Sequence, residues 1–86
     1  MQQQNQVDMR YLNYNDFIAA VSTRADYARQ EHDWRYGQAF FNVLLEETPE
    51  IANELRATKL DPFHKNAIEA ETYQRIRELY ETKEIK

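Results

Sequence analysis

Two histidines each lie near an aspartate, and these pairs are the sequence's closest approach to a metal-binding pattern. His32 is followed directly by Asp33, and His64 comes shortly after Asp61. A structural zinc site needs four ligands, typically cysteine and histidine at paired spacings. The chain has no cysteine, and its two histidines lie in different segments. We therefore expect no metal ligands and no metal cofactor.

The residues that could act as nucleophiles or acid–base groups form no constellation. Ser22 is the only serine, and no glycine-rich turn precedes it as in a nucleophile elbow. Glu46 and Glu47 are adjacent, so on a helix their side chains would point about 100° apart and could not act together as a catalytic dyad. A single glycine cannot form a phosphate-binding loop. The sequence predicts no catalytic residues, no cofactor-binding residues and no enzymatic activity.

The charge of the chain argues against general binding of nucleic acids. The net charge is −4, and all of the excess lies in residues 31–58, where six acidic residues accompany only Arg35 and Arg56. Binding to phosphates needs a basic footprint instead. The sequence therefore argues against nucleic acid as a partner.

No segment of the sequence is typical of a membrane or secreted protein. No apolar run approaches the roughly 20 residues that span a bilayer. The first six residues have neither the positive charge nor the apolar centre of a signal peptide. Together with the absence of cysteine, this predicts a cytoplasmic protein without membrane contact.

Glycine and proline are scarce, which favours helices joined by short connections over strands and turns. Apolar residues recur at helical spacing in residues 14–29, 34–47, 49–57 and 66–83. Asn13, Asp33 and Thr48 are suitable N-caps for the first three, with Pro49 at a first helical position. We expect an all-α domain of three or four helices, orthogonal or bundle-like, over residues 9–86. Residues 1–8 should form a disordered polar arm.

The second predicted helix is apolar over about 240° of its circumference. Such a helix is central to the fold or buried in an oligomer, so a homo-oligomer remains open. Gly37, the only glycine, falls inside this apolar arc and costs about 1 kcal/mol there relative to alanine. We expect another backbone to approach closely at this position.

Most of the eleven aromatic residues have the spacing of core residues, but Tyr27 and Tyr36 lie off the apolar arcs. Exposed tyrosines are frequent at binding hot spots. The other candidates are a narrow polar strip on the second helix, formed by Arg35, Gln38, Asn42 and Glu46, and the acidic residues Glu47, Glu50 and Glu54 that follow it. The predicted partner-binding residues are Arg35, Tyr36, Gln38, Asn42, Glu46, Glu47 and Glu50.

The run Trp34-Arg35-Tyr36-Gly37-Gln38-Ala39-Phe40-Phe41-Asn42, followed by Asp61-Pro62-Phe63, resembles a group of short uncharacterised proteins of phages and prophages. The resemblance covers about residues 14–63, and the charged segment after Phe63 departs from the pattern. It implies a phage origin and carries no activity or functional residue with it.

These observations predict a small phage-type interaction protein that binds a host protein and modulates or inhibits it. One alternative is an acidic DNA mimic that blocks a nucleic-acid-binding cleft, for which a net charge of −4 is small. The other is a weak nucleic-acid-binding module that uses the basic residues of the last helix, Arg75, Arg77, Lys83 and Lys86.

Overall fold

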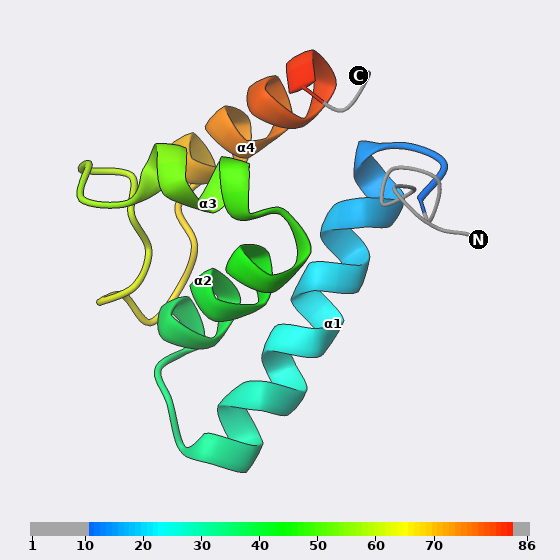
Figure 1. Ribbon diagram of the computed structural model, residues 1–86. Helices are drawn as coiled ribbons and strands as arrows, with labels where there is room; N and C mark the ends of the chain where they lie inside the picture. The colour runs from blue at the N-terminus through cyan, green and yellow to red at the C-terminus, as the bar shows by residue number, and fades with distance from the viewer. Residues whose placement is uncertain (1–10, 84–86) are drawn as a thin grey trace.

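The computed structural model describes residues 11–83, and this part of the chain contains four helices and no strand (Figure 1). The helices are α1 (Tyr14–His32), α2 (Tyr36–Glu47), α3 (Pro49–Leu55) and α4 (Ala70–Lys83). The prediction of an all-α fold of three or four packed helices is confirmed, and the number in this part of the chain is four. The predicted arm of residues 1–8 lies outside the described residues.

Helix α1 begins as the sequence predicts but ends three residues later. The Asn13 side chain accepts a hydrogen bond from the Asp16 backbone N–H at 3.0 Å, which caps the helix start. At the other end, Asp33 adopts left-handed backbone angles, φ 58° and ψ 40°, and its N–H bonds to the Arg29 carbonyl. The prediction that Asp33 is the N-cap of α2 was therefore wrong. Aspartate tolerates the left-handed conformation better than most residues, so it ends α1 instead.

Helix α2 starts at Tyr36, and its N-cap residue Arg35 makes no capping bond with its side chain. A backbone group replaces that bond, because the Gly37 N–H donates to the Lys65 carbonyl at 2.9 Å. A Cβ atom at position 37 would overlap the carbonyl oxygens of Lys65 and Pro62. The predicted close approach of another backbone at Gly37 is thus confirmed. The glycine lets a distant loop satisfy one of the unpaired N–H groups at the helix start.

The core lies around α2, which is buried on several sides by other parts of the same chain. Helix α2 packs against α1 and α3, and α4 contacts α1 and α3 (Figure 1). The α1 contribution follows a strict four-residue spacing of Phe17, Val21 and Ala25. The wide apolar arc of α2 is therefore accounted for within one molecule. The other buried core residues are Ala39, Phe40, Phe41, Val43, Leu44, Ile51, Ala52, Leu55, Ile76, Leu79 and Tyr80.

Aromatic rings connect the start of α1 to the end of α4. Phe17 stacks on Tyr80 with ring centroids 4.6 Å apart, and Tyr11 meets the edge of Phe17 at 5.5 Å. Tyr14 also contacts Tyr80, at 6.0 Å, and its hydroxyl donates to the Tyr73 carbonyl at 3.3 Å. Two segments far apart in sequence are thus held by ring packing.

Thr48 and Pro49 separate α2 from α3, although Thr48 does not act as the predicted side-chain cap. Its hydroxyl donates back to the Leu44 carbonyl at 3.2 Å, which satisfies the end of α2 rather than the start of α3. Pro49 occupies the first turn of α3, as its fixed φ and missing N–H favour. Helix α3 then ends at Leu55, earlier than predicted, because Ala57 adopts φ 65°.

The connection of residues 56–69 has an ordered structure built on polar side chains. Asp61 accepts hydrogen bonds from the backbone N–H groups of Ala57 and Phe63, at 3.0 and 2.9 Å. The buried Thr72 hydroxyl donates to the Leu60 carbonyl at 2.9 Å. Helix α4 begins only at Ala70, so the predicted start at residue 66 was wrong. The connection before α4 instead places the carbonyls of Pro62 and Lys65 against Gly37.

Candidate functional site

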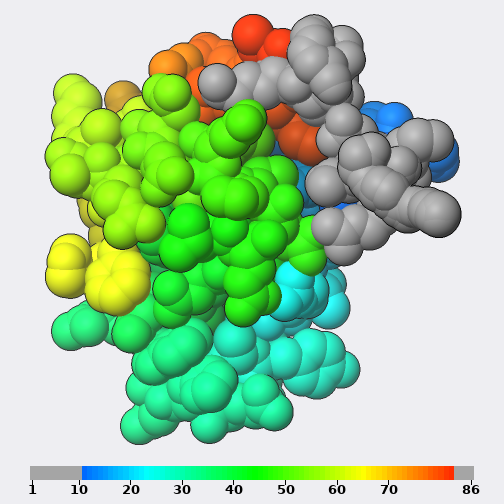
Figure 2. All heavy atoms as spheres, viewed as in Figure 1, coloured from blue at the N-terminus to red at the C-terminus, as the bar shows by residue number. Residues whose placement is uncertain are grey.

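An open groove of about 700 Å³ runs between the C-terminal half of α1 and helix α2. The end of α1 and the connection to α2, in blue-green, lie at the lower end of the molecule in Figure 2. We call the feature the α1/α2 groove. It is lined from α1 by Arg24, Tyr27, Ala28, Glu31 and His32, from the connection by Trp34, and from α2 by Asn42, Val43, Leu45 and Glu46.

Tyr27 is the most distinctive residue of the α1/α2 groove. Its exposed fraction is 69%, and only Leu12 is a more exposed large apolar residue in the described part of the chain. The position follows from the α1 spacing, because residues 21 and 25 face the core while residue 27 lies off that face. The ring therefore buries little of its area on folding and remains exposed for contact with a partner.

Trp34 and His32 form the far end of the α1/α2 groove. Their rings stack at a centroid distance of 4.2 Å with an interplanar angle of 20°. The left-handed backbone at Asp33 reverses the chain between them and brings the two rings face to face. Trp34 is half-buried against the core and is the only tryptophan of the chain.

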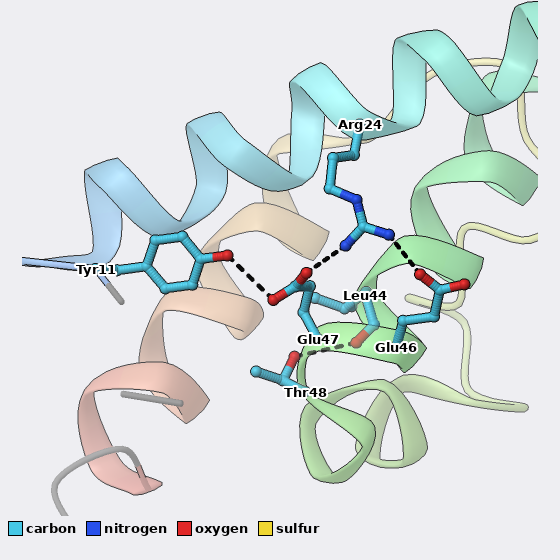
Figure 3. A network of polar contacts seen from close by, with 6 residues as sticks. All are labelled: Tyr11, Arg24, Leu44, Glu46, Glu47 and Thr48. Atoms are coloured by element: carbon cyan, nitrogen blue, oxygen red, sulfur yellow. Dashed lines mark hydrogen bonds and ion pairs between the residues drawn. The ribbon is translucent and has the colours of Figure 1, made fainter. Parts of the chain in front are cut away.

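At the near end, Arg24 joins α1 to the last turn of α2 (Figure 3). Its guanidinium contacts the carboxylates of both Glu46, at 2.5 Å, and Glu47. The Tyr11 hydroxyl donates to the other oxygen of Glu47 at 3.0 Å. The side chains of Arg24 and Glu46 are 45% and 65% exposed, whereas that of Glu47 is only 8% exposed.

Glu46 and Glu47 both contact Arg24 although their side chains diverge. The two terminal nitrogens of the planar guanidinium donate in different directions, so one arginine can contact two divergent carboxylates. The hydrogen bond to Glu46 is the main cause of a raised pKa of Arg24, with charge attraction from Glu47 adding to it. Of these three groups only Arg24 and Glu46 line the α1/α2 groove, together with the carboxylate of Glu31.

The structure places the predicted partner-binding residues in different environments. Asn42 and Glu46 line the α1/α2 groove. Arg35 and Glu50 are exposed outside it, and Gln38 is half-buried. Tyr36 is half-buried and packs on Phe40 with ring centroids 6.0 Å apart, while Glu47 faces Arg24 and Tyr11.

Sequence reasoning missed the α1 side of the groove, namely Arg24, Ala28, Glu31 and His32. Tyr27 and Tyr36 were both singled out because they lie off the best-packed arcs; Tyr27 is exposed, whereas Tyr36 is half-buried. Arg24 carried no comparable signal, because an arginine on a polar helix face is ordinary. Its role depends on two glutamates more than twenty residues away along the chain.

Within residues 11–83, no three histidine or carboxylate side chains come together as ligands for a metal ion. His64 instead meets the ring of Phe63 edge-on, with centroids 5.1 Å apart. The same part of the chain has no helix with the length and apolar character needed to cross a membrane.

Comparison of the chain with models of protein families, with curated proteins and with solved structures gives no match. The groove and its side chains are therefore the basis for any functional inference.

Proposed function

We propose that this chain is a protein-binding module that uses the α1/α2 groove as its contact surface. The observation that carries the proposal is the 69% exposed ring of Tyr27 beside a groove that ends in the Trp34–His32 stack. Protein interfaces characteristically have an apolar, aromatic-rich centre and a polar rim. Here Arg24, Glu31 and Glu46 provide such a rim. The resemblance to phage proteins suggests a host protein as the partner.

The energetic argument rests on tyrosine as an anchor. Tyrosine offers a large, rigid contact area with few rotatable bonds, and truncation of such an anchor costs about 2 kcal/mol or more. That corresponds to roughly a thirtyfold loss of affinity. Because Tyr27 contributes little to the core, its removal should leave the stability of the fold nearly unchanged.

Two observations weaken the nucleic-acid alternatives. Glu46 and Glu47 are paired with Arg24, so the field that a DNA mimic would need is reduced where the acidic residues are densest. On α4, Arg75 and Arg77 pair with Glu78 and Glu81 at 3.2 and 3.0 Å. These arginines are therefore less available for phosphates.

Site-specific photo-crosslinking tests the proposal directly. A photoreactive phenylalanine analogue at position 27 should cross-link a discrete protein from bacterial lysate. The same analogue at position 53, an exposed position on α3, should not. Wild-type protein added in excess should abolish the cross-link, whereas Tyr27→Ala protein should compete poorly. Equal labelling from both positions, or none from position 27, would contradict a contact surface at the groove.

A further inference from the structure

We propose that the exposed face of α1 around Tyr27 pairs with the same face of a second copy of this chain. The two helices run antiparallel about a two-fold axis. This pairing uses the surface of the proposed function but needs no host partner. It follows from the order of the charges along the C-terminal half of α1 and from the side chains at the centre of that segment.

The charges along this part of α1 are self-complementary. The segment reads Arg24-Ala25-Asp26-Tyr27-Ala28-Arg29-Gln30-Glu31. Reversal of this order places each arginine opposite a carboxylate, whereas a parallel pairing in register would place like charges together. A two-fold interface contacts the same patch on both copies and therefore requires such self-complementarity. An axis between Tyr27 and Ala28 sets Arg24 opposite Glu31 of the second copy. The same axis sets Asp26 opposite Arg29 of the second copy.

The helical spacing places the two charge pairs on different sides of Tyr27. Arg24 and Glu31 are seven residues apart, so they lie within about 20° of each other around the helix. Both line the α1/α2 groove. Asp26 and Arg29 lie toward the other side. The 69% exposed ring of Tyr27 then meets Ala28 of the second copy. Ala28 is small and half-buried in the groove, which leaves room for the ring.

Three of these charges have no partner within one molecule. Asp26, Arg29 and Glu31 are exposed, and their side chains form no ion pair or hydrogen bond within residues 11–83. On α4, by contrast, the exposed arginines pair with glutamates of their own helix. Opposite charges across an interface steer association and fix its register. Arg24 can keep its contacts to α2 in the dimer, because a guanidinium has donors for more than one carboxylate.

The dimer and a complex with a host protein exclude each other, because Tyr27 is central to both contacts. Self-association covers the exposed ring while no partner is bound. Binding of a partner then depends on the protein concentration, since the dimer has to dissociate first.

Charge exchange between two variants tests the pairing. Analytical ultracentrifugation over a range of concentrations should show that the wild-type chain dimerises. In a two-fold dimer, Asp26→Arg and Arg29→Asp each turn two attractive contacts into repulsive ones. Each variant should therefore dimerise about tenfold or more weakly. An equal mixture of the two variants should restore dimerisation, because both contacts between unlike chains are attractive again.

A charge reversal elsewhere gives the matched control. Glu54→Arg changes an exposed charge on α3, outside the paired face, and should dimerise as the wild type does. Asp26 and Arg29 are also exposed, so all three variants should melt at nearly the wild-type temperature. Restoration in the mixture additionally requires that both variants are folded.

The inference is overturned by a wild-type chain that stays monomeric at every concentration. It is equally overturned by a mixture that dimerises no better than either variant, or by an equal loss in Glu54→Arg. The photoreactive analogue at position 27 separates these results from the proposed function. In purified protein it should cross-link to α1 of a second copy and give a product of doubled mass. A monomeric chain that still cross-links a host protein would contradict only the pairing, whereas a dimer without a host cross-link would contradict only the proposed function.

Discussion

At the scale of single residues, Gly37 is the position where sequence and structure agree most closely. A glycine inside the apolar arc of a helix indicates a close approach, and the loop carbonyls of Pro62 and Lys65 are what approach it. The identity of that neighbour could not be predicted. It depends on how residues 56–69 fold, and their hydrogen bonds link side chains to backbone groups without a periodic pattern.

Gly37→Ala should destabilise the protein by about 2–4 kcal/mol, through overpacking and loss of the bond to Lys65. In an ordinary helix the same change stabilises by about 1 kcal/mol, so the sign is diagnostic. The effect is measured as a shift of the midpoint of urea denaturation. The slope of the free energy of unfolding against urea concentration should stay unchanged. A midpoint at or above that of the wild type would show that the loop does not contact Gly37.

The contacts of Arg24 with Glu46 and Glu47 could not be predicted from the sequence. Arg24→Ala should cost about 1–3 kcal/mol, because it removes an ionic partner from the nearly buried carboxylate of Glu47. Arg75→Ala provides the matched control, since its pair with Glu78 is about half exposed on both sides and should contribute less than about 1 kcal/mol. Equal losses from the two variants in thermal melts would argue against a special role for the Arg24 cluster.

At the scale of helices, the sequence predicted the type of the elements and a number of three or four, whereas several helix ends were misplaced. The apolar spacing in α1 and α2 is strong because each helix has a well-defined buried face. The ends are decided by local competition: Asp33 is a good N-cap in isolation, yet it stops α1 in the left-handed conformation. Residues 66–69 have helical spacing but lie outside α4, in the connection that supplies the cap of α2.

Ala57 is a second left-handed position, φ 65°, directly after the C-cap of α3. Alanine pays a steric cost there that glycine avoids, so Ala57→Gly should stabilise the protein by about 1 kcal/mol. Ala19→Gly, at an exposed position within α1, should destabilise it by about the same amount. Opposite shifts of the two denaturation midpoints are the expected result. Destabilisation by both changes would mean that Ala57 is not left-handed in solution.

At the scale of the whole molecule, contacts between the ends of the described chain complete the fold. The stacking of Phe17 on Tyr80 and the hydrogen bond from Tyr14 to Tyr73 join α1 to α4. The sequence identified these aromatics as core residues through their spacing, but it could not pair them. The same holds for the α1/α2 groove. The sequence indicated the polar strip on α2 but not the residues that α1 contributes to the groove. Periodicity shows which face of a helix is buried and leaves open which helix covers it.

The contact between α1 and α4 makes the stability of the protein sensitive to alkaline pH. Burial is the main cause of a raised pKa for both Tyr14 and Tyr73, because it disfavours the phenolate. In the unfolded chain both hydroxyls titrate near pH 10. Above that pH the unfolded state binds fewer protons than the folded state, so the free energy of unfolding decreases as pH rises toward the raised pKa values.

The free energy of unfolding should therefore be flat near pH 8 to 9 with respect to these groups and should fall above about pH 10. Replacing both residues, Tyr14→Phe with Tyr73→Phe, should reduce the loss between about pH 8 and pH 10.5, although the lost hydrogen bond lowers stability slightly at both values. Tyr27→Phe is the control, because it removes a hydroxyl of the exposed surface outside the contact between α1 and α4. If the double variant lost as much stability as the wild type over this range, the alkaline sensitivity would have to arise outside the contact between α1 and α4.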